Sequence, residues 1–393
     1  MNGTHHSTFF APCPRGLEGV LHHELIQLSA EAIVPLQGGV QFRGPYNLCY
    51  RVNLHSRIAS RVLWAISECS YRTEHDIYHK ALSLNWPSWF AVNRRIKVHV
   101  SAHHCPLPSL EFVTLRIKDA ICDHFRKAQG TRPNVDTRNP DIGIYAFLDD
   151  KACTLYLDTT GEPLFKRGYR RAQGPSPLRE NLAAGILRLA GWSPGQVLLD
   201  PMCGSGTFLL EAAQIAANIA PGLNRSFAFE NFLNFDQDTW TQLLTESQAG
   251  ERPIGAGTLF GFDHDLQAVS GAKMNVEAAG FADAIAIDHA DVLEVQPSHP
   301  QGLLVTNPPY GVRRGHDTQL EEWYPQLGDA LKRHFVGWRA FIFTADLRLP
   351  KRIRLAAARR TPLFNGALEC RLFEYPIVQG SNRSKPIPSA LAT

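Results

Sequence analysis

The 393-residue sequence lacks several features that would place it in a common class of protein. It has no uninterrupted run of about eighteen apolar residues, so we expect no membrane-spanning helix. Its first residues show no charged segment followed by an apolar one, so we expect no export signal. Its eight cysteines form no CxxC pair and no close Cys/His quartet. We therefore expect reduced thiols, no metal site and a cytoplasmic location.

A strong excess of charge of either sign is also missing, because the net charge is only +3. The distribution is nevertheless uneven. Residues 1–171 contain 21 Lys and Arg against 15 Asp and Glu, which is +6, and the remaining 19 against 22 give −3. A basic front half predicts contact with a polyanion, although an ordinary solvated face can carry the same excess.

The rear half alternates strand and helix patterns. Strands are predicted at 196–200, 258–263, 284–288, 302–306 and 339–345, helices at 206–220, 265–280 and 320–335, and a final hairpin around Asn365-Gly366. This alternation predicts an α/β Rossmann-like fold with a parallel, doubly wound sheet and an antiparallel edge. An aromatic segment at 221–257 interrupts the rhythm and is predicted to contain helix and loop.

The front half reads as a mixed α+β region. Helices are predicted at 15–28, 47–66 and 113–130, strands at 38–44 and 95–103, and a hairpin at 141–161 that turns at Asp149-Asp150. The charged segment 165–177 is punctuated by Gly and Pro, so we expect the domain junction there. The tail from about residue 380 is expected to be disordered.

The stretch "LLDPMCGSGTF" at 198–208 predicts a strand, a glycine-rich turn and the start of a helix. Gly204 and Gly206 permit tight backbone geometry and close approach of a ligand. The stretch is neither GxGxxG nor GxxxxGK[ST], and no lysine is present to bind phosphates. Asp200 would repel a pyrophosphate but attract a cationic amino-acid group, as S-adenosylmethionine (SAM) carries. An ordinary βα turn is the alternative interpretation.

Two further acids follow predicted strands. Asp263 ends the second strand of the rear half, where a carboxylate can accept hydrogen bonds from ribose hydroxyls. Asp265, two residues later, is predicted to cap the next helix. Asp291 follows the third strand, where it could accept from the adenine amino group, or could be an ordinary solvated acid.

The stretch "TNPPYG" at 306–311 follows the fourth buried strand. An exocyclic amine is a poor nucleophile because its lone pair is delocalised into the ring. The side-chain oxygen of Asn307 and the carbonyl of Pro308 can accept its two N–H groups, and the prolines lock that geometry. Tyr310 can stack on a flipped base. A chance Pro-Pro turn is the alternative.

Together, "DPMCGSGTFLLEAA" and "TNPPYG" resemble the class I SAM-dependent amino-methyltransferases. In the front half, "RGLEGVLHHEL", "QGGVQFRG", "SRIASRVL", "LRIKDAICDHFR", "RPNVD" and "LFKRGYRR" resemble the ferredoxin-like and THUMP regions of bacterial enzymes that methylate the exocyclic amine of a guanine in 23S rRNA. The resemblance implies SAM as cofactor and RNA as partner. It also implies a ferredoxin-like region at 1–60, a THUMP domain at 61–165, a methyltransferase domain at 166–379 and a tail at 380–393.

The resemblance also implies roles for individual residues. The expected catalytic residues are Asn307, Pro308, Pro309 and Tyr310. The expected SAM-binding residues are Pro177, Leu178, Asp200, Pro201, Cys203, Gly204, Ser205, Gly206, Thr207, Asp263, Asp291 and Asn307. Cys203 is expected to pack rather than react, because no activating base is evident. The candidates for phosphate contacts are Arg94, Arg95, Lys97, Arg132, Lys166, Arg167, Arg170 and Arg171.

Several alternatives stay open at this point. Many members of the family carry a second, C-terminal methyltransferase domain; because this sequence stops soon after "EYPIV", we expect the form with a single methyltransferase domain. A DNA or other-RNA amino-methyltransferase would use a similar Asn-Pro-Pro-Tyr loop. A non-catalytic RNA-binding ribosome-assembly factor is a third interpretation. The oligomeric state and the identity of the guanine are not predicted.

Overall fold

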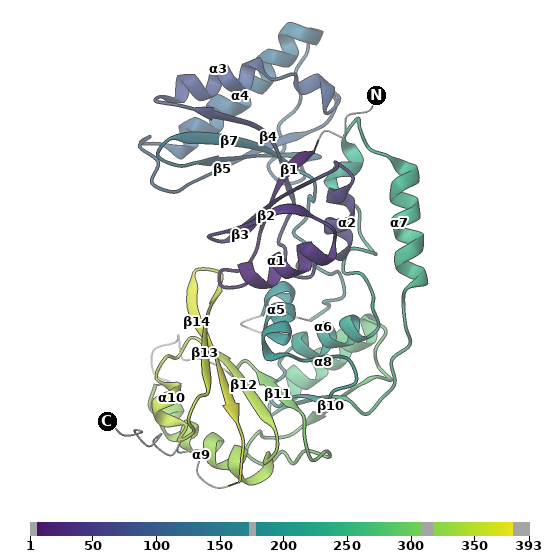
Figure 1. The fold of residues 1–393 in the computed structure, drawn as a ribbon, viewed down its shortest axis with the longest axis vertical. Coiled ribbons are helices and arrows are strands. Elements are labelled where there is room, and N and C mark those ends of the chain that lie inside the picture. The colour runs from purple at the N-terminus through teal and green to yellow at the C-terminus, as the bar shows by residue number, and fades with distance from the viewer. Residues whose placement is uncertain (1–5, 173–177, 309–316, 380–393) are drawn as a thin grey trace, which may run out of the picture. The chain divides into compact units, whose positions relative to one another are not determined.

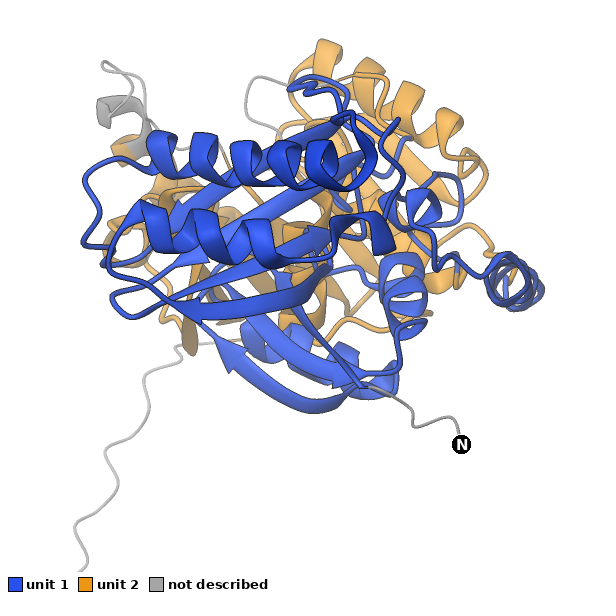
Figure 2. Ribbon diagram, turned by 90° about the horizontal axis from the view of Figure 1, so that it is seen from above, with its two compact units in different colours: residues 1–168, 219–251 blue, residues 169–218, 252–393 orange. Residues whose placement is uncertain are grey.

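The computed structural model describes residues 6–172, 178–308 and 317–379. The chain divides into two compact units (Figure 2). The first unit consists of residues 1–168 and 219–251, and the second of residues 169–218 and 252–393. The first break falls inside the segment 165–177 that its composition suggests as a junction. Across the described ranges, no helix has both the length and the apolar character needed to cross a bilayer.

The first unit is built on a seven-stranded sheet with the order β2-β3-β1-β4-β7-β6-β5. Neighbouring strands run antiparallel except for the β5–β6 pair. The strands are β1 (Ser7–Pro12), β2 (Glu31–Leu36), β3 (Gly39–Gly44), β4 (Leu63–Ser70), β5 (Ile96–Ala102), β6 (Ile142–Leu148) and β7 (Ala152–Asp158). The helices are α1 (Glu18–Gln27), α2 (Leu48–His55), α3 (Glu74–Ser83), α4 (Leu110–Gln129) and α7 (Gln237–Ala249), with short 3-10 turns at Trp86–Ser88 and Ala228–Asn231.

The longest helix of this unit, α4, shows how apolar spacing and capping residues in the sequence can predict a helix. Its buried residues recur at helical spacing and include Val113, Ile117, Ile121 and Phe125. The helix begins after Ser109, whose hydroxyl accepts from the Phe112 amide, and it ends at Gly130 in the left-handed conformation. The predicted helix at 113–130 is therefore confirmed, as is the hairpin formed by β6 and β7.

The predicted helix at 47–66 is wrong over its second half. The helix α2 ends at His55, and residues from Leu63 onward form strand β4. This strand lies inside the sheet and pairs with β1 on one side and β7 on the other. Ladder hydrogen bonds on both edges outweigh the weak local preference for helix. The sequence patterns also failed to indicate β1, β2 and α3.

The aromatic segment between α6 and β9 belongs to the first unit, whereas the sequence places it within a continuous region from 166 to 379. The rings of Tyr50 and Phe229 lie 4.4 Å apart between centroids, and those of Phe229 and Trp240 lie 5.1 Å apart. The Asp236 amide donates to the Tyr50 hydroxyl at 3.0 Å. Burial of these rings holds residues 219–251 against α2, far from them in the sequence.

The second unit carries a seven-stranded sheet with the order β10-β9-β8-β11-β12-β14-β13. The strands are β8 (Leu198–Asp200), β9 (Leu259–Asp263), β10 (Ile285–His289), β11 (Leu303–Thr306), β12 (Arg339–Thr344), β13 (Arg359–Asn365) and β14 (Leu368–Pro376). The first five in spatial order are parallel, and β14 and β13 add an antiparallel hairpin. The expected Rossmann-like architecture with an antiparallel edge is confirmed.

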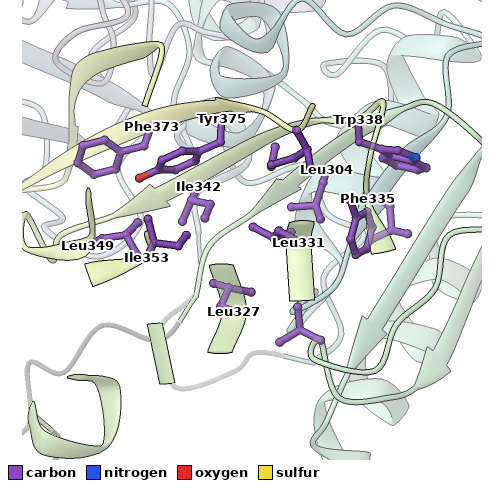
Figure 3. Close-up of a cluster of buried hydrophobic side chains, with 14 of the residues drawn as sticks. Leu304, Leu327, Leu331, Phe335, Trp338, Ile342, Leu349, Ile353, Phe373 and Tyr375 are labelled. Carbon is purple, nitrogen blue, oxygen red and sulfur yellow. The ribbon is translucent and has the colours of Figure 1, made fainter. Parts of the chain in front are cut away.

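Helices cover both faces of this sheet (Figure 1). The helices α5 (Glu180–Ala190), α6 (Thr207–Ala216) and α8 (Leu266–Ala278) lie on one face, and α9 (Asp317–His334) and α10 (Leu349–Arg352) lie on the other. On the second face, Leu327 and Leu331 of α9 pack with Leu304 of β11 and Ile342 of β12 (Figure 3). Each such fully buried side chain contributes about 1.5–3 kcal/mol. The cluster therefore fixes the strand that leads to Asn307.

Candidate active site

The polar residues of the proposed site follow the carboxyl ends of adjacent parallel strands. In the sheet register, Asp200 lies opposite Gly261, and Asp263 lies opposite His289. Leu304 of β11 lies opposite Leu199 of β8. The chain order reverses between β8 and β11, and such a switch point opens a crevice for ligands at the carboxyl edge of a doubly wound sheet.

The glycine-rich turn after β8 adopts a conformation that only glycine accepts easily. Gly204 and Gly206 have φ angles of 53° and 78°. The Cys203 amide donates to the Phe262 carbonyl at 2.8 Å, which ties the turn to β9. A Cβ atom added to Gly204 would meet no heavy atom of the described residues within 4 Å. The turn thus leaves open space in front of a fixed backbone, as a closely approaching cofactor requires.

The carboxylate of Asp263 already organises this turn. One of its oxygens accepts from the Gly204 amide at 2.9 Å, and the other accepts from the Asp265 amide at 3.0 Å. Asp265 itself caps α8 by accepting from the Gln267 amide, which confirms its predicted role. A carboxylate oxygen has two lone pairs, so Asp263 retains the capacity to accept from ribose hydroxyls.

Asp200, the last residue of β8, is only 2% exposed. One carboxyl oxygen accepts from the Thr306 hydroxyl at 2.8 Å and from the Met202 amide at 3.3 Å. Burial raises the pKa of Asp200 to about 7, and these hydrogen bonds and the nearby Asp263 modify that effect. A bound cationic group would compensate the buried charge, which fits the ammonium or sulfonium of SAM.

The amide side chain of Asn307 has an incomplete set of hydrogen bonds. Its Oδ1 atom is buried and has no hydrogen-bond partner within the described part of the chain. A buried acceptor left in this state costs about 1–3 kcal/mol, so its geometry suits a donor that arrives from outside. Pro308 is buried beside it. The other expected residues Pro309, Tyr310 and Pro177 lie outside the described residues.

The remaining expected cofactor residues differ in burial and in their hydrogen bonds. Pro201, Gly206 and Thr207 are buried, whereas Ser205 is half-buried and its hydroxyl lies 3.2 Å from that of Thr207. Asp291 is exposed after β10, and it accepts from the Leu293 amide at 2.9 Å. Cys203 is buried, and burial raises the pKa of its thiol well above the ordinary value. A thiol held neutral supports the packing role expected for Cys203.

Two arginines expected to meet phosphates have internal roles instead. Arg170 forms an ion pair with Glu180 at 3.0 Å and donates to the Leu178 carbonyl and the Thr207 hydroxyl. It therefore joins the buried Leu178 to the first residue of α6. Arg167 is 9% exposed and donates to the carbonyls of Leu164 and Arg57. Both guanidinium groups are used to hold chain segments together, which the count of charges could not indicate.

Asn275 on α8 is a site residue that the sequence patterns missed. Its Oδ1 accepts from the amides of Arg171 and Ala172 at 2.7 and 2.9 Å. Its Nδ2 donates to the Ser205 carbonyl at 3.1 Å, and only 1% of the residue is exposed. The residue thus ties the glycine-rich turn to the segment before α5. The available signal in the sequence is that Asn275, a polar residue, falls on the helix face that buries Ala272 and Val276.

The basic residues of the first unit that are candidates for phosphate contacts differ in their ion pairs and hydrogen bonds. Arg95 is held by Asp136 at 3.1 Å and Asp141 at 3.0 Å. Lys166 pairs with Glu162 at 2.8 Å. The Lys97 ammonium donates to the Thr137 carbonyl and has no acidic partner among the described residues, and Arg132 is exposed. In the ranges the structure covers, no three His, Cys, Asp or Glu side chains form a metal-binding group.

Comparison with known proteins adds to this geometry. Residues 167–374 match the family model of the RMKL-like methyltransferase domain, residues 71–158 match the THUMP domain, and residues 8–63 match the RlmL ferredoxin-like domain. A Synechocystis protein assigned provisionally as an RNA methyltransferase is 39% identical over 370 residues, which cover 94% of this chain and 96% of that protein.

Two further relatives extend the comparison. The ribosomal RNA large subunit methyltransferase K/L of Aeromonas hydrophila is 39% identical over 397 residues, covering 96% of this chain and 55% of that enzyme. The chain therefore spans about half the length of the K/L enzymes that it matches. The crystal structure of SMU.472, a provisionally assigned methyltransferase complexed with SAH, superposes with a TM-score of 0.86 at 28% identity and covers 97% of this chain and 99% of that one.

Proposed function

Because the chain belongs to the RMKL-like methyltransferase family, we propose that it methylates the exocyclic N2 amino group of a guanine in 23S rRNA. Membership of the family makes it a methyltransferase that uses SAM. The RNA substrate is supported by the THUMP match and by relatives named as RNA methyltransferases. The choice of an exocyclic amine rests on the site itself.

The observation that carries the choice is the buried Oδ1 of Asn307 after β11, which has no hydrogen-bond partner among the described residues. An amino group has an N–H bond to offer this acceptor, whereas a ring nitrogen that attacks through its lone pair has none. Hydrogen bonding draws the amine towards tetrahedral geometry and stabilises positive charge as it develops. We infer that the Pro308 carbonyl accepts the second N–H, because the rigid proline backbone aims it in advance.

The residues around the glycine-rich turn suit the methyl donor. SAM supplies an electrophilic methyl group on a positively charged sulfur. We propose that Asp200 faces its cationic part, that Asp263 accepts from the ribose hydroxyls and that Asp291 lies towards the adenine. The backbone at Gly204 leaves room for the donor to approach. After transfer, the extra proton on the methylated amine is hydrogen-bonded to Asn307 and is lost to water, so no strong base is required.

We propose that the first unit selects the RNA, with a ferredoxin-like region at 1–60 and a THUMP domain at 61–165. Counterion release by Lys and Arg makes such binding dependent on salt. Of the basic candidates, Lys97 and Arg132 fit phosphate contact best. Neither has an acidic partner among the described residues, whereas Arg95 is paired with Asp136 and Arg167 is buried.

The proposal is tested by mapping methylated guanines in 23S rRNA by mass spectrometry, from cells with and without this protein. We expect one N2-methylguanine to disappear in its absence and to return with the wild type but not with Asn307→Ala. The purified protein should methylate 23S rRNA and leave duplex DNA unmodified. Methylation at a ring nitrogen such as guanine N7 would contradict the role of Asn307, and methylated adenine in DNA would support the DNA alternative.

A further inference from the structure

A single hydroxyl connects the two halves of the proposed site. Thr306 is the last residue of β11, and its hydroxyl donates to the Asp200 carboxyl group at 2.8 Å. Asp200 is the last residue of β8, so the bond joins the ends of two neighbouring strands. Thr306 and Asp200 are 1% and 2% exposed, so water does not compete for the bond. The residue after Thr306 is Asn307.

The sheet register shows why this bond matters. On the β12 side, the pairing of β11 continues to Thr306, which lies opposite Ile342. On the β8 side, the pairing ends earlier, with Leu304 opposite Leu199. Beyond that point, the Thr306 side chain reaches across to Asp200 in place of a ladder hydrogen bond. The backbone that precedes Asn307 is thereby tied to the strand that leads into the glycine-rich turn.

We propose that Thr306 is a positioning residue that couples the methyl-donor site to the amine site, because its hydroxyl holds both the Asp200 carboxylate and the strand end that carries Asn307. The inference rests on the proposed function, in which Asp200 faces the donor and Asn307 the amine. Removal of the hydroxyl should therefore affect donor binding through Asp200 and methyl transfer through Asn307.

The electrostatics of Asp200 provide a readout that packing alone would not change. Burial raises its pKa to about 7, the Thr306 hydroxyl and the Met202 amide lower the pKa, and the carboxylate of Asp263 on β9 raises it. The neighbouring Cys203 thiol on the turn is neutral, and on α5 the Glu180 carboxylate is paired with Arg170. Thr306 is thus the side chain whose hydrogen bond keeps Asp200 ionisable near neutral pH.

The sign of the expected pH dependence follows from linkage. A cationic donor favours the ionised carboxyl group, so binding displaces the proton and SAM affinity rises as the pH rises through the pKa of Asp200. With a pKa near 7, affinity should increase about tenfold between pH 6 and pH 8 and level off above. Without the Thr306 hydroxyl the pKa of Asp200 is higher, so the same rise should move to higher pH.

The experiment is isothermal titration of the full-length protein with SAM between pH 6 and pH 9.5. Thr306→Val, which keeps the shape but removes the hydroxyl, should bind SAM roughly tenfold more weakly at pH 7 and approach the wild type at the upper end. Thr306→Ser should restore the wild-type profile. Asp200→Asn should bind weakly with an affinity that does not change with pH. Thr306→Ala offers a second test if the valine variant does not fold.

Turnover of 23S rRNA at saturating SAM and high pH tests the inferred effect of Thr306 on methyl transfer through Asn307. Thr306→Val should still show a kcat reduced by about tenfold or more, because Asn307 is no longer held in place, whereas Thr306→Ser should not. An unchanged pH profile in the valine variant would overturn the inference, as would an equal loss of affinity at every pH together with a lower melting temperature. If the wild type itself binds no SAM, the proposed function fails first.

Discussion

The two seven-stranded sheets distribute polar side chains in opposite ways. In the second unit, β10, β9, β8, β11 and β12 are parallel, so their carboxyl ends meet at one edge and bring Asp200, Asp263 and Thr306 together. In the first unit most neighbours are antiparallel, so successive strands end at opposite edges. A parallel sheet concentrates chemistry in one place, whereas the antiparallel sheet offers a broad surface.

The two units also differ in how their charged side chains are paired. In the first unit, Arg95 is neutralised by Asp136 and Asp141, and Arg61 pairs with the buried Asp158. At the second unit's sheet edge, Asp200 and Asp263 are satisfied by a hydroxyl and by backbone amides. Asp263 also has the exposed His264 imidazole 3.5 Å from one oxygen, whereas Asp200 forms no ion pair among the described residues. A buried acid held by uncharged donors suits a cationic ligand, which explains why the cofactor is assigned to this unit.

The largest effect is expected at Asn307. Asn307→Ala should lower the kcat for methyl transfer by about a thousandfold, because the lost acceptor acts on the transition state. SAM affinity, measured by titration, should stay within about tenfold of the wild type. Lys97→Gln in the other unit is the matched control and should leave kcat at saturating RNA unchanged. Wild-type turnover in Asn307→Ala would end its catalytic assignment.

A smaller effect is expected at Asp263. Asp263→Ala should weaken SAM binding by about 10- to 100-fold, because it removes both the proposed ribose acceptor and the support of the Gly204 amide. The control is Asp265→Ala, two residues away, which removes a helix cap and should cost about 1 kcal/mol of unfolding free energy. If both variants bind SAM equally well, Asp263 does not contact the cofactor.

A smaller effect, on RNA binding, is expected at Lys97 and Arg132 in the first unit. Lys97→Gln and Arg132→Gln should each weaken RNA binding by about three- to tenfold and lower the slope of log affinity against log salt by about one. Filter binding at several salt concentrations would measure both quantities. An unchanged slope in both variants would show that these cations do not contact phosphate, and would move the RNA interface elsewhere.

The smallest effect is expected at Arg95. Its guanidinium is already paired with Asp136 and Asp141, and the side chain is 44% exposed. Arg95→Gln should therefore leave the midpoint of chemical denaturation nearly unchanged and change RNA affinity less than Arg132→Gln does. Chemical denaturation and the same binding assay would measure the two effects. A larger loss of RNA affinity than in Arg132→Gln would reverse the ranking of these cations.

Local patterns predicted the elements of the second unit well. The strands β8, β9, β11 and β12 are short apolar runs that end in Asp or Thr. Its helices begin or end near residues such as Asp265 and Gly280, the latter with a φ angle of 78°. The sequence alone could not assign β4, because its strand character depends on partners on both edges. Nor could it show that Arg167 and Arg170 are turned inward, since a charge in a sequence carries no direction.

The order of residues by itself determined the alternation of strands and helices, the glycine-rich turn and the Asn-Pro-Pro stretch, because these depend on backbone preferences within a few residues. Only the tertiary structure decided that 219–251 joins the first unit, that Asn275 holds the turn and that Thr306 reaches Asp200. Those outcomes depend on contacts between residues up to 186 positions apart in the chain, and no local preference encodes such contacts.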